Sequence, residues 1–541
     1  MATTHPPWFD GRTAEADDCV LHRIVDARAA RQADAALVSF ADGERWTCSE
    51  TAARMRAMAA LLARHGVQRG DRVPAWLPNG ADLLQAWLGC SYLGAVLIPL
   101  NTDYRGSLLQ HVLRECDARV MLLHPQLGER LPDIDGGVPE HLLYCGAQAP
   151  AAAAPQGERL PSLPTAPDGE LPPAAALAAW DTQMVIFTSG TTGPSKGVLC
   201  SYGHIYSTAR ATYGYLTADD CMLTELPVFH VGGASSVVAA LSSGARLALY
   251  PGFSTQDYWQ RIAREGATST SGIIGSMADF LAQAPRRDDD RDNPLRVVTL
   301  MLTEQSMRVA RRFGFSYLSG FNMTELSGPL ITEIDCPVPG SLGRPRDGCE
   351  CRVVDEHDLP VAPGEVGELV VRSAHPWTFF SGYLNRPEAT AQAWRNGWFH
   401  SGDLVRQDAA GNFFFVDRKK DAIRRRGENV SSAEVEAEAL AHPQVVAVCA
   451  VAVPSELAED EILLAYVTAA GSELEARALA EFLIPRMPHY MVPRFFRRLD
   501  TLPRTATNKI RKIEIREAGV GDDCWDREAA GLQLKRTRFD P

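Results

Sequence analysis

A polar, glycine-rich loop directly after an apolar run is the feature that most constrains this sequence. The run MVIF at residues 184–187 is typical of a buried strand, and TSGTTGPSKGV follows it at residues 188–198. Glycine allows positive φ and a close backbone approach to a ligand, so N–H groups, hydroxyls and the Lys196 ammonium can together surround a polyphosphate. The order G-x-x-G-x-x-K-G is not a Walker loop. A flexible linker is the alternative, but a linker would not need lysine beside glycine immediately after a strand.

Length and composition exclude several classes of protein. A chain of 541 residues exceeds the size of one hydrophobic core and predicts two or more domains. The net charge of −13 argues against a general binder of nucleic acid or anionic membranes. Residues 1–18 lack the apolar core of a signal peptide. The 12 cysteines are scattered, without C-x-x-C spacing, so reduced thiols in the cytoplasm are predicted rather than disulfides or zinc.

The pattern of apolar residues predicts an α/β chain with a β-rich subregion and a small C-terminal α+β domain. Helical periods alternate with short apolar strands, such as residues 72–77 and 118–123, up to residue 145 and again from 180 to about 416. Residues 83–100 predict a buried helix, a turn at Gly94 and a strand rather than a membrane span.

Five other segments complete this organisation. Residues 146–179, rich in alanine and proline, predict a surface linker, and residues 351–373 predict two strands joined by a turn. Strands are predicted at 445–454 and 461–469 in the C-terminal domain, and the tail after about Val520 is predicted to be poorly ordered.

The loop at residues 188–198 resembles the phosphate loop of the AMP-forming adenylate enzymes. That superfamily contains acyl-CoA synthetases, luciferases and peptide-synthetase adenylation domains. The resemblance extends over roughly residues 20–515. It implies that ATP and a carboxylic acid give an acyl adenylate and pyrophosphate. It also implies nucleotide binding by the loop residues Thr188, Ser189, Gly190, Thr191, Thr192, Gly193 and Lys196.

The second motif is SGFNMTELSG at residues 319–328, where the family usually has Tyr-Gly-x-Thr-Glu. Phe321 and Asn322 depart from that pattern but occupy nucleotide-binding positions, and Phe321 is expected to stack on adenine. Glu325 is expected to bind Mg²⁺, which prefers hard oxygen donors and bridges nucleotide phosphates. The family roles imply Thr188 as a further metal ligand and Thr324 as a contact to the α-phosphate. Residues 299–314 lack the glycines that the family often has near adenine.

The third motif, WFHSGDL at residues 398–404, predicts a ribose site. Asp403 matches the family aspartate that binds both ribose hydroxyls, and a carboxylate is a suitable acceptor for a vicinal diol. Arg418 matches an arginine that also contacts the ribose, and Lys420 falls at the family's hinge. The same stretch is compatible with a solvated basic loop before a helix that begins near Ser432.

Three further positions match residues that act on the acyl group. Lys509, in PRTATNKIRK, matches the lysine that contacts the carboxylate and α-phosphate during adenylation. Gly427 is expected beside the incoming pantetheine. His230, in PVFHVGG, matches the histidine beside the acid, and the Phe-Asp pair typical of amino-acid activation is absent. Some of the arginines at residues 424–426 are expected to face the CoA phosphates, although a solvated run is the alternative.

Together the motifs predict an AMP-forming acid–CoA ligase of α/β class. Residues 1–419 are predicted to form a large domain of α/β subdomains and a β-rich subdomain. Residues 420–541 are predicted to form a small domain that rotates about a hinge near Lys420. ATP, Mg²⁺ and CoA are the expected small molecules, with no nucleic-acid or integral membrane contact. A homodimer is left open.

Three alternatives stay open at this stage. Transfer of the acyl group to a carrier protein is the alternative within the class. An α/β hydrolase is more distant, because G-x-S-x-G is matched around Ser195. A binding protein without activity is disfavoured because the lysines and acids of the motifs are all present.

Overall fold

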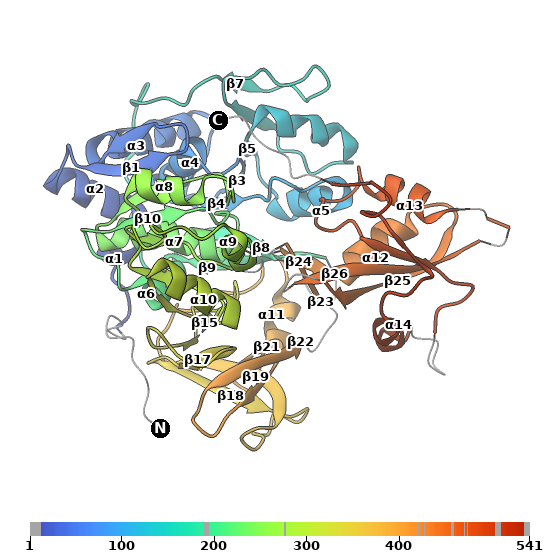
Figure 1. Ribbon diagram of the computed structural model, residues 1–541. Helices are drawn as coiled ribbons and strands as arrows, with labels where there is room; N and C mark the ends of the chain where they lie inside the picture. The colour runs from blue at the N-terminus through green and yellow to red at the C-terminus, as the bar shows by residue number, and fades with distance from the viewer. Residues whose placement is uncertain are drawn as a thin grey trace.

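The protein has a large α/β body and a smaller C-terminal part on one side of it, as the sequence predicts (Figure 1). The computed structural model describes residues 12–188, 194–274, 277–418, 422–426, 428–455, 459–469, 471–472, 474–503 and 510–534, with only the backbone at residues 417, 418, 422 and 429. The predicted boundary at residues 419 and 420 and the hinge at Lys420 lie outside this range.

A seven-stranded sheet contains the two strands on either side of the glycine-rich loop. Its order is β7-β6-β5-β3-β4-β8-β9, parallel throughout except for the last strand. The predicted strands at residues 72–77, 118–123 and 184–187 are confirmed, and residues 146–179 contain only one short strand. The members are β3 (Arg72–Trp76), β4 (Val96–Pro99), β5 (Val120–Leu123), β6 (His141–Cys145), β7 (Glu158–Leu160), β8 (Thr182–Thr188) and β9 (Lys196–Ser201).

A second, five-stranded sheet has the order β12-β10-β11-β1-β2, and a separate parallel pair, β13 and β14, lies near its β12 edge. The strands are β1 (Ala36–Phe40), β2 (Arg45–Thr47), β10 (Cys221–Thr224), β11 (Arg246–Leu249), β12 (Ser269–Thr270), β13 (Val297–Thr299) and β14 (Ser316–Leu318).

Helices fill the space between the two sheets. Helix α4 (Ala81–Leu93) packs on β3 and β4, α7 (Val231–Ser243) packs on β10 and β11, and α2 (Leu21–Arg31) contacts both helices. Helix α4 is buried on every side from Leu83 onward, which its apolar sequence requires. It ends at Gly94, whose φ of 73° makes the predicted turn before β4. None of the helices in the described part of the chain is long and apolar enough to cross a membrane.

The body has further helices outside this layer. They are α1 (Ala16–Cys19), α3 (Cys48–Arg64), α5 (Gly106–Cys116), η1 (Pro125–Asp133), α6 (Tyr202–Tyr213), α8 (Tyr258–Glu265), α9 (Met277–Gln283), α10 (Glu304–Phe313) and α11 (Pro387–Ala393), with α3 and α6 contacting α4 and α7 respectively.

The predicted β-rich subregion is an eight-stranded sheet. Strands β18 and β19 form the expected hairpin across residues 351–373. The strand order is β15-β16-β17-β22-β21-β19-β18, with β20 added to β21. The bounds are β15 (Gly320–Phe321), β16 (Leu330–Ile331), β17 (Ser341–Pro345), β18 (Cys349–Val354), β19 (Val366–Ser373), β20 (Trp394–Arg395), β21 (Trp398–Gln407) and β22 (Phe413–Arg418).

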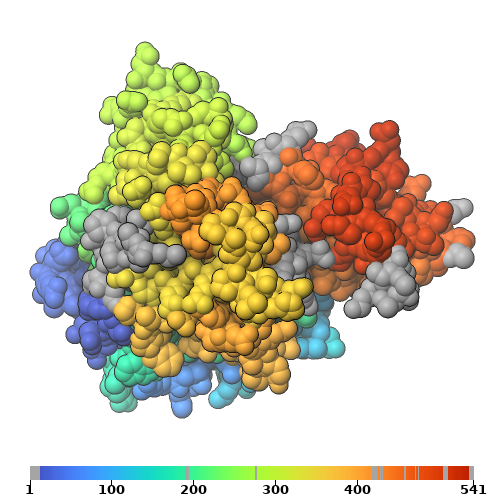
Figure 2. All heavy atoms as spheres, turned by 90° about the horizontal axis from the view of Figure 1, so that it is seen from below, coloured from blue at the N-terminus to red at the C-terminus, as the bar shows by residue number. Residues whose placement is uncertain are grey.

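The C-terminal part is a small α+β unit that projects as a lobe beside the larger body (Figure 2). Its sheet has the order β25-β26-β27-β28, and a hairpin of β23 and β24 precedes it. The elements are β23 (Ala422–Arg425), β24 (Glu428–Ser431), α12 (Ser432–Leu440), β25 (Val445–Pro454), β26 (Asp460–Thr468), α13 (Ala476–Leu483), β27 (Phe495–Arg498), α14 (Lys512–Ala518) and β28 (Cys524–Asp526).

The prediction of a poorly ordered tail after Val520 is wrong for the residues up to 534. Strand β28 pairs antiparallel with β27, and the Trp525 ring packs edge-on against Phe496 with centroids 5.6 Å apart. Arg527 is fully buried and donates from Nε to the carbonyl of Pro493. The tail is polar overall, but the Trp525 ring and the buried Arg527 together hold it to the sheet.

Candidate active site

The phosphate loop connects two antiparallel strands at the edge of the seven-stranded sheet. Thr188 ends β8 and Lys196 begins β9, and the two residues are paired in register. The Thr188 hydroxyl oxygen lies 3.5 Å from the Lys196 carbonyl oxygen. The loop between them contains Ser189, Gly190, Thr191, Thr192 and Gly193, which lie outside the described residues. The base of the loop is therefore fixed by the sheet.

Tyr383 links this loop to the Thr-Glu motif. The Lys196 Nζ lies over the Tyr383 ring, 4.6 Å from its centroid. The Tyr383 hydroxyl donates to Oε1 of Glu325 at 2.7 Å. Burial and the neighbouring Glu325 carboxylate raise the pKa of Tyr383, so its hydroxyl remains a donor. Tyr383 is a site residue that the sequence motifs did not reveal.

Glu325 and Thr188 have the chemistry that a magnesium ion needs. Mg²⁺ usually takes only one or two protein ligands and completes its shell with phosphate oxygens and water. Among the described residues, no hydrogen-bond donor contacts Oε2 of Glu325, and no group of three or more His, Cys, Asp and Glu side chains gathers as a metal cage. The residues fit a metal shared with a nucleotide rather than a metal held by protein alone.

Hydrogen bonds from within the chain shape the Thr-Glu loop. Phe321 is buried on β15, opposite Leu330 of β16. The side-chain oxygen of Asn322 accepts from the Gly328 N–H at 2.8 Å. The fully buried Arg346 guanidinium donates to the Ser327 and Gly328 carbonyls. Thr324 is partly exposed at the tip, where it is accessible to a ligand.

The two predicted ribose residues face each other on neighbouring strands. Asp403 of β21 pairs in register with Arg418 of β22. Asp403 is 2% exposed, and its N–H donates to the Ser401 hydroxyl. The Gly402 N–H donates to Oε1 of Glu368, whose Oε2 lies 3.2 Å from the His400 ring. These contacts fix the backbone at Asp403.

His230 meets the C-terminal part of the chain. It stands at the N-terminus of α7, with its ring 4.8 Å from that of Phe229. Its Nε2 lies 2.9 Å from Oε2 of Glu428, the first residue of β24. Gly427 precedes Glu428 and lies outside the described residues, as does Lys509. The hairpin of β23 and β24 therefore reaches the histidine that the sequence places beside the acid.

Several polar contacts between described residues join the C-terminal part to the body in this arrangement. Besides the contact between His230 and Glu428, the Ser107 hydroxyl of α5 donates to Glu438 of α12, and Asn101 donates to the Tyr490 hydroxyl at 3.1 Å. Another is between Ser195 and Glu434, and Nδ1 of His489 in the C-terminal part lies 3.6 Å from Oδ2 of Asp103 in the body. A single cluster of buried apolar side chains, which includes Leu108 and Leu109 of the body and Val430, Val435 and Met491 of the C-terminal part, continues across the junction.

Ser195 donates twice to Glu434. Its N–H and its hydroxyl lie 2.9 and 2.8 Å from Oε1 of that residue. Glu434 stands in the first turn of α12, a helix that begins at Ser432 as the sequence predicts. Burial raises the pKa of Glu434 to about 7. Tyr104 and Tyr490, which face Glu434, stay neutral because burial raises their pKa, and His111 contacts the Ser195 carbonyl at 2.8 Å.

The environment of Ser195 does not suit a hydrolase nucleophile. Ser195 lies between antiparallel strands, whereas the nucleophile of an α/β hydrolase occupies a strand-to-helix turn. Its hydroxyl donates to a carboxyl group rather than to a histidine.

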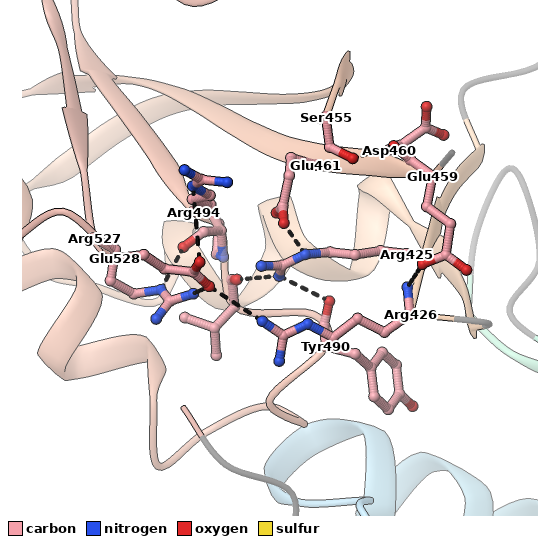
Figure 3. Close-up of polar contacts among 12 residues, drawn as sticks. Arg425, Arg426, Ser455, Glu459, Asp460, Glu461, Tyr490, Arg494, Arg527 and Glu528 are labelled. Atoms are coloured by element: carbon pink, nitrogen blue, oxygen red, sulfur yellow. Dashed lines mark hydrogen bonds and ion pairs between the residues drawn. The ribbon is translucent and has the colours of Figure 1, made fainter. Parts of the chain in front are cut away.

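The prediction that some of the arginines at residues 424–426 face CoA cannot depend on Arg425. Arg425 is 1% exposed; its Nε lies 2.6 Å from Glu461, and it donates to the carbonyls of Tyr490 and Val492 (Figure 3). It is therefore part of the core of the C-terminal unit.

The neighbouring arginines are also held by acidic residues. Arg426 has a φ of 55°; its N–H donates to Glu459 at 2.6 Å, and its guanidinium donates to Glu528 at 3.1 Å. The N–H of Arg424 donates to Asp460 at 3.0 Å. A role in CoA binding stays a prediction for Arg424 and Arg426.

The chain belongs to the AMP-binding enzyme family. Residues 25–384 match the family described as AMP-binding enzyme, and residues 434–509 match the AMP-binding enzyme C-terminal domain. The resemblance drawn from the four motifs is confirmed.

The relatives are CoA ligases. A crotonobetaine/carnitine–CoA ligase of Salmonella agona (strain SL483) is 30% identical over 479 residues, which cover 85% of this chain and 90% of the relative. The protein is accordingly an AMP-forming acid–CoA ligase, as the sequence predicts, and neither a carrier-protein acceptor nor a hydrolase is favoured.

Two structures of the o-succinylbenzoate–CoA synthetase of Bacillus subtilis share the fold. A double mutant bound with its product analogue gives a TM-score of 0.78 at 24% identity, over 91% of this chain and 98% of that one. The complex with AMP gives 0.64 at 25% identity, over 92% of this chain and 99% of that one.

Proposed function

We propose that the protein joins a carboxylic acid to CoA in two half-reactions at one site. The carboxylate oxygen first bonds to the α-phosphorus of ATP as the bond to pyrophosphate breaks. The CoA sulfur then bonds to the acyl carbon and loses its proton, and AMP leaves. The observation that carries this proposal is the contact of Lys196 and Glu325 with Tyr383, which joins the phosphate loop to the Thr-Glu motif.

In the first half-reaction, the described residues bind and orient the nucleotide. Lys196 and the loop before it would hold the phosphates, and Thr324 would contact the α-phosphate. Glu325 and Thr188 would hold Mg²⁺, which neutralises phosphate charge when bound. Phe321 would lie against adenine. The register between β21 and β22 supports a shared ribose site for Asp403 and Arg418.

The domain division is part of the same proposal. Residues 1–419 would stay fixed while residues 420–541 rotate about Lys420, bringing Lys509 to the acid for adenylation and Gly427 to the pantetheine for thioester formation. The contact between His230 and Glu428 supports assigning the observed arrangement to the thioester-forming state. The higher TM-score to the product-analogue complex than to the AMP complex of the same enzyme supports it too.

The substrates beyond ATP are proposed on chemical grounds. His230 in place of an aspartate favours an acid without an α-amine, and the S. agona relative favours a small acid. CoA is proposed as the acceptor. All twelve cysteines are free thiols, which supports a reducing compartment such as the cytoplasm. A homodimer stays an untested prediction.

A screen over carboxylic acids tests the function. Purified protein, ATP, Mg²⁺ and CoA would be incubated with crotonobetaine, carnitine, o-succinylbenzoate and panels of short, alicyclic and aromatic acids. Pyrophosphate release and the mass of the acyl-CoA product would be measured, with Glu325→Gln as the control. Release of pyrophosphate without any acyl-CoA would overturn the choice of CoA as acceptor.

A further inference from the structure

The contact between Ser195 and Glu434 places a carboxyl group of the C-terminal part on the phosphate loop. Ser195 immediately precedes Lys196 and is 3% exposed. Both of its donors, the N–H and the hydroxyl, point at one oxygen of Glu434, at 2.9 and 2.8 Å. The two residues come from opposite sides of the junction between the body and the C-terminal part.

A carboxyl oxygen and a phosphate oxygen accept the same hydrogen bonds. Loops that bind phosphate do so with backbone N–H and hydroxyl donors of the kind that Ser195 supplies. While Glu434 accepts from both, those donors cannot serve a phosphate at the same time. A negatively charged phosphate chain would also meet an acidic group at that position.

The need to hold the body and the C-terminal part together does not explain why a glutamate stands at position 434. The junction already has an apolar cluster, the contact of Ser107 with Glu438 and the contact of Asn101 with Tyr490. Burying a carboxyl group there carries a desolvation cost that an apolar residue would avoid. What Glu434 adds is that its carboxyl group accepts the hydrogen bonds of the two Ser195 donors.

We propose that Glu434 is a positioning residue that closes the phosphate loop in the thioester-forming arrangement. Its carboxyl group takes the Ser195 donors, so docking of the C-terminal part and occupation of the loop by pyrophosphate exclude each other. Departure of pyrophosphate thereby permits docking, and docking prevents pyrophosphate from returning to attack the acyl adenylate. This inference depends on the proposed function for the identity of the two half-reactions.

A binding experiment tests the exclusion without any acid or CoA. Cysteines placed by Ser107→Cys and Glu438→Cys, whose native side chains are in contact, would be oxidised to hold the docked arrangement. Pyrophosphate binding would be measured by calorimetry before and after reduction. The oxidised protein should bind pyrophosphate at least about ten-fold more weakly than the reduced protein, since one hydrogen bond to an anionic group corresponds to about that factor.

Glu434→Ala in the same cysteine background should remove most of that difference. Equal binding by the oxidised and reduced parents would overturn the proposal, as would exclusion that persists in full after Glu434→Ala. Failure of the protein to make acyl-CoA would refute the proposed function but not this proposal, because the two pyrophosphate-binding measurements do not depend on acyl-CoA formation.

Kinetics of the thioester step provide a second, independent measurement. Acyl adenylate of an acid found in the screen would be mixed with CoA and increasing pyrophosphate. Glu434→Ala and the matched control Glu438→Ala, on the same helix, should both slow the step because both weaken docking. Inhibition by pyrophosphate should become weaker in Glu434→Ala and stronger in Glu438→Ala, since only the first frees the Ser195 donors. If pyrophosphate inhibition changed in the same direction in both variants, Glu434 would be only a docking contact and the proposal would be refuted.

Discussion

Replacing Tyr383 with phenylalanine removes one hydroxyl from the centre of the candidate site. The phenylalanine ring would keep its place beneath Lys196, whose Nζ lies 4.6 Å from the centroid. What is lost is the 2.7 Å hydrogen bond to Glu325, a carboxylate that is only 7% exposed. The substitution therefore separates the orientation of Glu325 from the position of Lys196.

The magnitude follows from the kind of bond that is lost. A hydrogen bond to a charged group contributes about 1.5–3 kcal/mol, and a buried acceptor left without its donor loses the full amount. Each 1.4 kcal/mol is about ten-fold in rate. Tyr383→Phe should therefore slow adenylation about ten- to hundred-fold and raise the magnesium concentration needed for half-maximal rate, because Glu325 would no longer be fixed toward the ion.

Acid-dependent exchange of pyrophosphate into ATP, measured over a magnesium titration, checks this expectation. Tyr202→Phe is the matched control: it removes another buried tyrosine hydroxyl, whose 3.0 Å contact is with the neutral Ser91. The control should leave the magnesium dependence unchanged. An exchange rate and magnesium dependence for Tyr383→Phe equal to those of the wild type would refute the role given to Tyr383.

Four further outcomes are expected. Lys509→Ala should slow adenylation by several orders of magnitude, with a lost contact to developing charge of roughly 3–5 kcal/mol, while acyl adenylate supplied with CoA still gives acyl-CoA; equal loss in both assays would contradict domain rotation. Glu325→Gln should raise the magnesium requirement in the exchange assay, because an amide is a poorer ligand for a hard dication. Arg425→Gln should destabilise the protein by about 3–5 kcal/mol, because Glu461 loses its buried partner, and a thermal melt would register the loss. The pKa of Glu434 is raised to about 7 by burial, so its protonated form favours docking at low pH, and this contribution is lost as pH rises through 7. The thioester rate of the wild type relative to Glu434→Gln should therefore fall about ten-fold between pH 6 and 8, and a flat ratio would show that Glu434 does not titrate in the docked state.

Local patterns in the sequence were sufficient to predict the strands of the body. Strands such as β3 and β8 are short apolar runs bounded by polar residues, and both lie inside the sheet, β3 between two parallel strands and β8 between parallel β4 and antiparallel β9. The tail could not be predicted in this way. Strand β28 exists because β27 offers it a partner and Trp525 reaches Phe496, and neither partner is near it in the sequence.

In the candidate site too, some residues could be predicted from local patterns, whereas others depend on contacts between residues far apart in the sequence. The register of β21 and β22 brings Asp403 opposite Arg418, as the motifs anticipate. Arg425 could have been assigned to the core, because alternate residues of a strand face the same side and Ile423 is buried two positions before it. Tyr383 and Glu434 gain their roles from contacts far apart in the sequence, to Glu325 and Ser195, which no periodic pattern encodes.

The acidic side chains around Arg425 and Arg426 have a mechanical consequence. Arg425 fixes one strand of the β23–β24 hairpin to β26, and Glu528 from the C-terminal tail restrains the turn at Arg426. The hairpin cannot swing apart from the sheet behind it without breaking these ion pairs. In the proposed rotation, the hairpin and the sheet would therefore move as one rigid body. The angle of that rotation, rather than the closure of a loose loop, would then decide when the thiol can reach the acyl group.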